Sequence, residues 1–140
     1  MDRVSHILLV DDEPEFLFSA AIGLRVAGFR VTVSSNGAEA LDAMEKAMEG
    51  TTPVDLMVTD LVMQGMGGME LIVAVRKRWS SLPILIVTGF FDKSLEREIE
   101  TQGCQGHILK PFRSEEFVGR IKGILREASG AASPAASPSE

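Results

Sequence analysis

Three aspartates, a threonine and a lysine are the side chains of this sequence best suited to phosphoryl chemistry. They are Asp11 and Asp12 near the amino terminus, Asp60 near the middle, and then Thr88 and Lys110. Carboxylates bind hard divalent cations, a hydroxyl can donate a hydrogen bond to a phosphoryl oxygen, and an ammonium can pair with another. Such a set could position a phosphoryl group and neutralise its charge, which is most of what phosphoryl transfer requires.

All five residues follow short apolar runs, and this shared setting predicts where they lie. The runs are residues 7–10, 31–33, 56–58, 84–87 and 108–109. Short runs of this kind, several rich in Val and Ile and most ending in polar residues, are typical of buried parallel strands. Helical spacing fills the intervals, so five strands alternate with five helices and predict a parallel sheet with helices on both faces. The candidate residues should then meet at the carboxyl edge of the sheet, where ligands bind in such folds.

Stop and cap residues predict the helix ends. Gly28 should end the first helix, Asn36 should cap the second, and Ser114 should cap the fifth. The second to fourth helices are expected over about residues 37–48, 68–79 and 93–102, and the fifth continues from Ser114 to about residue 127.

Asp60 is the expected phosphoacceptor, and the pair Asp11 and Asp12 the expected metal ligands. Taken singly, the aspartate pair could cap a helix and Lys110 could be a solvated side chain. Three carboxylates at one sheet edge repel one another, however, and their burial is costly unless a cation compensates. Mg²⁺ is usually bound by one or two carboxylates with water and phosphate oxygens. Asp60 stands alone after the central strand, which favours it as the carboxylate that forms an aspartyl phosphate.

Composition limits the classes of function. The chain has 140 residues, 45% of them hydrophobic and 24% charged, with a net charge of -6, which is typical of a single soluble domain. An acidic balance disfavours bulk binding to nucleic acid or to an anionic membrane. The single cysteine, Cys104, cannot form an internal disulfide, and no apolar segment approaches the roughly 18 residues of a membrane span. We therefore expect a cytoplasmic protein.

Two regions differ in composition. Residues 1–127 carry the alternating pattern and are expected to form one folded domain. Residues 128–140 consist almost entirely of Ala, Ser, Pro and Gly. Such a segment buries too little apolar surface to offset its conformational entropy, so a disordered tail is predicted.

With these residues in place, residues 4–127 resemble a two-component response regulator receiver domain. Four motifs carry the resemblance: ILLVDDE at 7–13, DLVMQGMGG at 60–68, VTG at 87–89 and KPF at 110–112. The resemblance implies a flavodoxin-like, doubly wound (βα)5 fold with strand order 2-1-3-4-5. It also implies a phosphoprotein of a phosphorelay, which accepts a phosphoryl group on Asp60 from a histidine kinase or phosphotransfer protein with Mg²⁺.

The same resemblance implies a role for each matching residue. Asp11, Asp12 and Asp60 would bind Mg²⁺ together with the backbone carbonyl of Val62. Thr88 and Lys110 would bind the phosphoryl group, and the peptide bond between Lys110 and Pro111 is a candidate for the cis form. The face formed by the fourth helix, fifth strand and fifth helix would change on phosphorylation, control a downstream protein and offer a surface for a homodimer. The protein would catalyse at most its own phosphorylation and dephosphorylation, so we do not expect an enzyme.

Two positions depart from the family pattern. Gln64 stands where the family usually has proline, so the loop after Asp60 is expected to be more mobile. His107 stands where the family usually has the switch aromatic, Tyr or Phe. An imidazole can carry charge near neutral pH, so we hypothesise that the coupling of Thr88 to His107 is altered or sensitive to pH.

Three alternative functions are considered. A phosphatase with an aspartate nucleophile needs a second aspartate two residues later, where this chain has Val62. A phosphate-independent interaction module is the second alternative, and the complete acidic set, Thr88 and Lys110 argue against it. A flavin-binding domain of similar topology is disfavoured because no phosphate-cradling loop follows the first strand.

Overall fold

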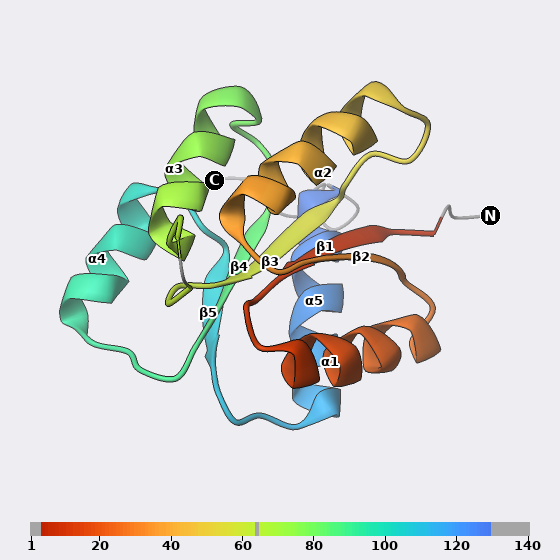
Figure 1. The fold of residues 1–140 in the computed structure, drawn as a ribbon. Helices are drawn as coiled ribbons and strands as arrows, with labels where there is room; N and C mark the ends of the chain where they lie inside the picture. Colours follow the sequence, from red (N-terminus) through yellow and green to blue (C-terminus); the bar gives the residue numbers. More distant parts are fainter. Residues whose placement is uncertain (1–3, 64, 130–140) are drawn as a thin grey trace.

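The computed structural model describes residues 4–63 and 65–129, in which five strands and five helices alternate along the chain (Figure 1). The strands are β1 (His6–Val10), β2 (Arg30–Ser34), β3 (Leu56–Asp60), β4 (Ile84–Thr88) and β5 (Gly106–Leu109). The helices are α1 (Pro14–Val26), α2 (Gly37–Glu49), α3 (Gly68–Arg78), α4 (Lys93–Thr101) and α5 (Ser114–Ala128). None of these helices has the length and apolar character that a membrane span needs.

The five strands form one parallel sheet in the order β2-β1-β3-β4-β5. This order confirms the predicted doubly wound (βα)5 fold. The register places the carboxyl ends of neighbouring strands side by side: Val10 pairs with Thr59, Asp60 with Val87, and Thr88 with Leu109. Residues that follow β1, β3, β4 and β5 therefore emerge at one edge, beside the point between β1 and β3 where the strand order reverses.

Helices cover both faces of the sheet (Figure 1), and the core has two layers, one on each face. Side chains alternate along each strand, so Ile7 and Leu9 pack toward α1 and α5, while Leu8 and Val10 pack toward α2 and α3. Every residue of β1, β3 and β4 is buried. These buried strands form a rigid support for the polar residues at their carboxyl ends.

Most predicted helix ends are confirmed, and one is wrong. Asn36 caps α2 by accepting a hydrogen bond from the Glu39 amide at 2.8 Å, and Gly28 follows α1 with φ of 104°. The predicted cap of α5, Ser114, is instead its first helical residue, and Arg113 holds the N-cap position without a side-chain cap. A Cβ placed on Gly23 would lie 3.1 Å from the Ser114 hydroxyl oxygen, so this side chain lies against α1.

The predicted boundary between domain and tail falls inside a helix. α5 includes Ala128, and Ser129 is its C-cap, with its amide donating to the Leu125 carbonyl at 3.0 Å. The remainder of the predicted disordered tail, residues 130–140, lies outside the described residues, as does Gln64.

Candidate functional site

The three predicted aspartates meet at the carboxyl edge of the sheet. One carboxylate oxygen each from Asp11, Asp12 and Asp60 lies within 4.8 Å of the others. Asp11 is fully buried and Asp60 is only 8% exposed, whereas Asp12 is half-buried. Two buried carboxylates beside a third create a strongly negative site that requires a compensating cation.

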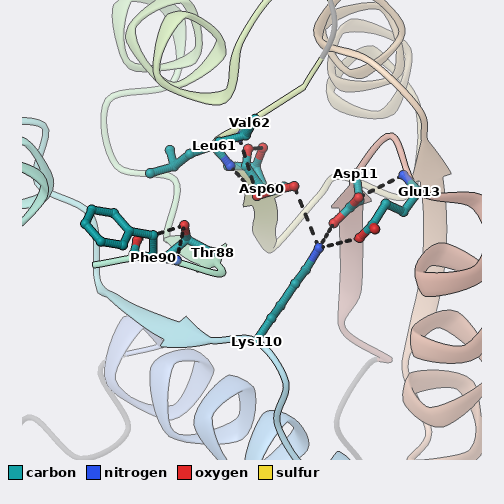
Figure 2. A network of polar contacts seen from close by, with 9 residues as sticks. Asp11, Glu13, Asp60, Leu61, Val62, Thr88, Phe90 and Lys110 are labelled. Atoms are coloured by element: carbon teal, nitrogen blue, oxygen red, sulfur yellow. Dashed lines mark hydrogen bonds and ion pairs between the residues drawn. The ribbon is translucent and has the colours of Figure 1, made fainter. Parts of the chain in front are cut away.

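Asp60 is the last residue of β3, and the chain that follows it turns over its carboxylate (Figure 2). Its Oδ1 accepts hydrogen bonds from the amides of Leu61 at 2.7 Å and Val62 at 3.4 Å. Burial and the neighbouring Asp11 carboxylate raise the pKa of Asp60, although Lys110 and the two amides oppose them. The two amides fix one oxygen of Asp60, while Oδ2 faces Lys110.

Lys110 extends from the end of β5 toward these carboxylates (Figure 2). Its ammonium lies 2.8 Å from Asp11 Oδ2, 2.9 Å from Glu13 Oε1 and 3.7 Å from Asp60 Oδ2. Burial alone would lower the pKa of Lys110, but its hydrogen bonds to Asp11 and Glu13 and the negative charges of Asp11 and Asp60 together raise the pKa. The lysine is therefore a permanent positive charge at the site.

The Thr88 hydroxyl is hydrogen-bonded to the backbone of Phe90, in the loop that follows β4 (Figure 2). It donates a hydrogen bond to the Phe90 carbonyl at 3.0 Å and accepts one from the Phe90 amide at 3.3 Å. Thr88 is the last residue of β4 and is 3% exposed. Its hydroxyl must leave Phe90 before it can donate to a group on Asp60.

His107 lies on β5 as predicted, and its ring stacks on Phe91. The ring centroids are 3.9 Å apart and the planes differ by 2°. Phe91 belongs to the segment between β4 and α4 that also holds Phe90, the partner of Thr88. The stack therefore joins β5 to the loop in which the Thr88 hydroxyl is bonded.

The donor set fits a hard divalent cation. All three candidate side-chain ligands are carboxylates, and no soft sulfur or imidazole ligand belongs to this group of described residues. An oxygen-only set suits Mg²⁺ rather than zinc or copper. The backbone carbonyl of Val62 stays a prediction, while the half-exposed Asp12 and buried Asp11 and Asp60 offer the charge that Mg²⁺ requires.

A model of the response regulator receiver domain family matches residues 7–122. The chain belongs to this family. Phosphorylation on an aspartate is the general function of receiver domains, which work with histidine kinases in two-component systems. This receiver domain is 30% identical over 126 residues to the transcriptional regulatory protein KdpE of Mycobacterium tuberculosis. That alignment covers 90% of this chain and 53% of KdpE, so the receiver domain spans about half the length of this relative.

Solved structures agree with the fold of this receiver domain. The chemotaxis protein CheY4 of Vibrio cholerae is 27% identical, with a TM-score of 0.78 over 87% of this chain and 99% of that one. A CheY-like receiver domain protein from Methanospirillum hungatei JF-1 is 24% identical, with a TM-score of 0.83 over 93% of this chain and 100% of that one. At 24% identity, the similarity to the Methanospirillum hungatei protein supports the fold alone.

Two neighbours of the site, Glu13 and Phe91, had no assigned role in the interpretation of the sequence. Glu13 pairs with Lys110, and Phe91 stacks on His107. Glu13 was visible only as the third acid of a run, with nothing in the sequence to indicate a partner 97 positions away. The cis peptide bond between Lys110 and Pro111 is present as the family resemblance implied.

Proposed function

We propose that this receiver domain is a phosphorylation-driven switch in which Asp60 accepts a phosphoryl group from a histidine kinase or phosphotransfer protein. The observation that carries the proposal is the position of Asp60. It ends the central strand β3, belongs to a cluster with Asp11 and Asp12, and directs Oδ2 toward the Lys110 ammonium at 3.7 Å. Asp60 is the one aspartate of the cluster that lies in a strand, and hydrogen bonds from two backbone amides hold its Oδ1 in place.

In the proposed reaction Asp60 Oδ2 attacks the phosphorus of a phosphohistidine. The new O–P bond forms as the P–N bond breaks, and the leaving imidazole nitrogen takes up a proton from solvent. The Leu61 and Val62 amides hold Oδ1, which orients the carboxylate for attack. The Lys110 ammonium then exchanges its carboxylate partners for a phosphoryl oxygen.

Asp11, Asp12, Asp60 and the Val62 carbonyl would bind Mg²⁺. The cation would neutralise negative charge between the acceptor and the incoming phosphoryl group. This assignment is supported by the all-oxygen cluster of the three aspartates and by the burial of Asp11 and Asp60. Three carboxylates, those of Asp11, Glu13 and Asp60, surround the Lys110 ammonium, and Asp12 adds a fourth negative charge to the cluster, so the negative charge of the site exceeds the positive charge of the lysine.

The proposed output is a change in the face formed by α4, β5 and α5. Phosphorylation would draw the Thr88 hydroxyl away from Phe90, and the stack of Phe91 on His107 would transmit this movement to β5. α4 suits such a change because Ile99 is its one buried residue. The face would bind or release a downstream protein, or pair with a second copy.

Intact mass spectrometry tests the proposed phosphorylation. The protein is incubated with acetyl phosphate and Mg²⁺, and we expect one phosphoryl adduct. The adduct should be absent in Asp60→Asn and when EDTA is added. Wild-type protein that gains no phosphoryl group under these conditions would favour a phosphate-independent interaction module.

A further inference from the structure

We propose that Phe16 is a positioning residue of the phosphorylation site, because its ring holds the Lys110 ammonium in place beside Asp60. This inference rests on the proposed function, since it assigns Phe16 to the same reaction. Phe16 lies in α1, and the Lys110 nitrogen is 4.3 Å from the centroid of its ring. An ammonium within about 6 Å of an aromatic face is attracted by the negative potential of the ring.

The ring and the carboxylates hold the same ammonium in different ways. Asp11 and Glu13 bind it as charged partners at 2.8 and 2.9 Å. The lysine side chain is only 19% exposed, so its ammonium has lost much of its water. The neutral Phe16 ring compensates part of this lost hydration. The attraction between an ammonium and an aromatic ring is stronger at a desolvated site than at an exposed one.

Phe16 is itself supported by other rings. The Phe112 ring meets it edge to face, with centroids 5.9 Å apart and planes at 88°. Phe112 in turn packs against Phe117 at 4.8 Å, and Phe117 is 2% exposed in the core. The ring beneath the ammonium is thus connected to the packed interface of α1 and α5.

Close packing does not fix the position of Lys110. A cavity of about 370 Å³ adjoins the lysine and is lined by Phe16, Phe112 and Phe117 together with small residues of α1 and α5. Because this space is open beside the lysine, the Lys110 side chain could adopt other rotamers. Its direction toward Asp60 must come from attraction, which the carboxylates and the Phe16 ring provide.

The neutral ring has a particular advantage during phosphoryl transfer. A phosphoryl oxygen on Asp60 would compete with Asp11 and Glu13 for the Lys110 ammonium. A carboxylate competes with the phosphoryl group for the ammonium, whereas a ring attracts the ammonium without offering a competing hydrogen-bond acceptor. Phe16 can therefore keep Lys110 in position in both states.

A series of fluorinated phenylalanines at position 16 tests this role. Mono-, di- and trifluorination weaken the potential of the ring face stepwise while nearly preserving its shape, so the variants should fold. The rate constant of phosphorylation by acetyl phosphate at saturating Mg²⁺ should fall with each fluorine, by about 3- to 10-fold over the series. The same residues at Phe29, which packs against the same core cluster away from the site, serve as the matched control and should leave the rate unchanged.

Three further variants test the same role of Phe16. Phe16→Leu should lose a similar factor in rate, and Phe16→Tyr should retain the wild-type rate. In a Lys110→Gln background, fluorination at position 16 should have no effect, because the ammonium is gone. Equal rates across the fluorinated series in a wild-type protein that is phosphorylated would overturn the role of Phe16 and leave the proposed function intact. Absence of phosphorylation in the wild type would instead count against the proposed function.

Discussion

The ammonium of Lys110 lies 2.8 Å from Oδ2 of Asp11, the carboxylate buried most deeply in the acidic cluster. The lysine therefore supplies positive charge to the same group that the proposed Mg²⁺ would share. In the proposed site, the lysine and the cation would therefore repel each other.

We expect Lys110→Gln to bind Mg²⁺ more tightly than the wild type does, while its phosphorylation becomes slower. Two unit charges about 4 Å apart interact by about 1 kcal/mol even in water, so the dissociation constant should fall about fivefold or more. Titration calorimetry with Mg²⁺ measures the change. Lys46→Gln is the matched control, because Lys46 pairs only with the exposed Asp42 on α2 among described ion pairs. Unchanged or weaker binding in Lys110→Gln would contradict the competition.

Replacement of Thr88 by alanine should separate phosphorylation from its output. The Thr88 hydroxyl bonds to Phe90 and would exchange that bond for a stronger, charge-assisted one to the phosphoryl group. We expect Thr88→Ala to be phosphorylated on Asp60 but to lose the change in hydrogen exchange across α4 and β5. Thr88→Ser keeps the hydroxyl and should keep the response. An alanine variant that responds like the wild type would show that another group carries the signal.

Gly68 should be among the least replaceable residues near the site. A Cβ at this first residue of α3 would collide with the carbonyl oxygen of Asp60 and would lie 2.6 Å from the Leu61 Cα, and neither backbone atom can move easily. We expect Gly68→Ala to lower the free energy of unfolding by about 2 kcal/mol or more. Gly123→Ala in α5 meets nothing within 4 Å and should raise it by about 0.5–1 kcal/mol. Urea denaturation compares the two, and equal midpoints would refute the steric argument.

The Cys104 thiol should react slowly with alkylating reagents near neutral pH. Burial raises its pKa from the usual 9.0 to about 11, although the Arg76 guanidinium acts to lower it. Because only the thiolate reacts, a shift of about two pH units makes alkylation about 100-fold slower at pH 8 than in the unfolded chain. The unfolded state releases this proton first, so the contribution of Cys104 to stability is complete below pH 9.0 and is lost as pH rises toward about 11.

The pH profile of alkylation by iodoacetamide checks this expectation. The rate for the folded protein should still be rising steeply above pH 9.0, whereas the rate for protein unfolded in urea should level off there. If the rate for the folded protein levels off at the same pH as the rate for the unfolded protein, the pKa of the Cys104 thiol is not raised by folding.

Much of the fold could be predicted because the interior of a parallel sheet leaves a clear pattern. β1, β3 and β4 are buried on both faces, so each appears in the sequence as an uninterrupted apolar run. The strands nevertheless extend beyond those runs. Thr59 and Asp60 belong to β3, and Thr88 belongs to β4, because ladder pairing continues through polar residues at the strand ends.

The parallel sheet predicts that the site residues emerge at one edge, but it does not predict the individual contacts between their side chains. Once the strand order is known, Asp11 and Asp60 must lie close together because β1 and β3 are neighbours, whereas Lys110 follows β5, two strands beyond β3. The contacts of Glu13 and Phe16 with Lys110 depend on how the start of α1 approaches the segment after β5, and no local pattern encodes that approach. Ser114 was assigned as a cap by its residue type, yet its side chain lies against Gly23 of the neighbouring helix.

Locating the phosphoryl group within the chain tests the central claim most directly. Protein incubated with acetyl phosphate and Mg²⁺ is reduced with borohydride, which converts an aspartyl phosphate to homoserine, and peptides are then sequenced by mass spectrometry. We expect homoserine at position 60 and nowhere else. Homoserine at position 11 or 12, or a phosphoryl group on a serine, threonine or histidine with position 60 unmodified, would contradict the assignment of Asp60 as the phosphoacceptor.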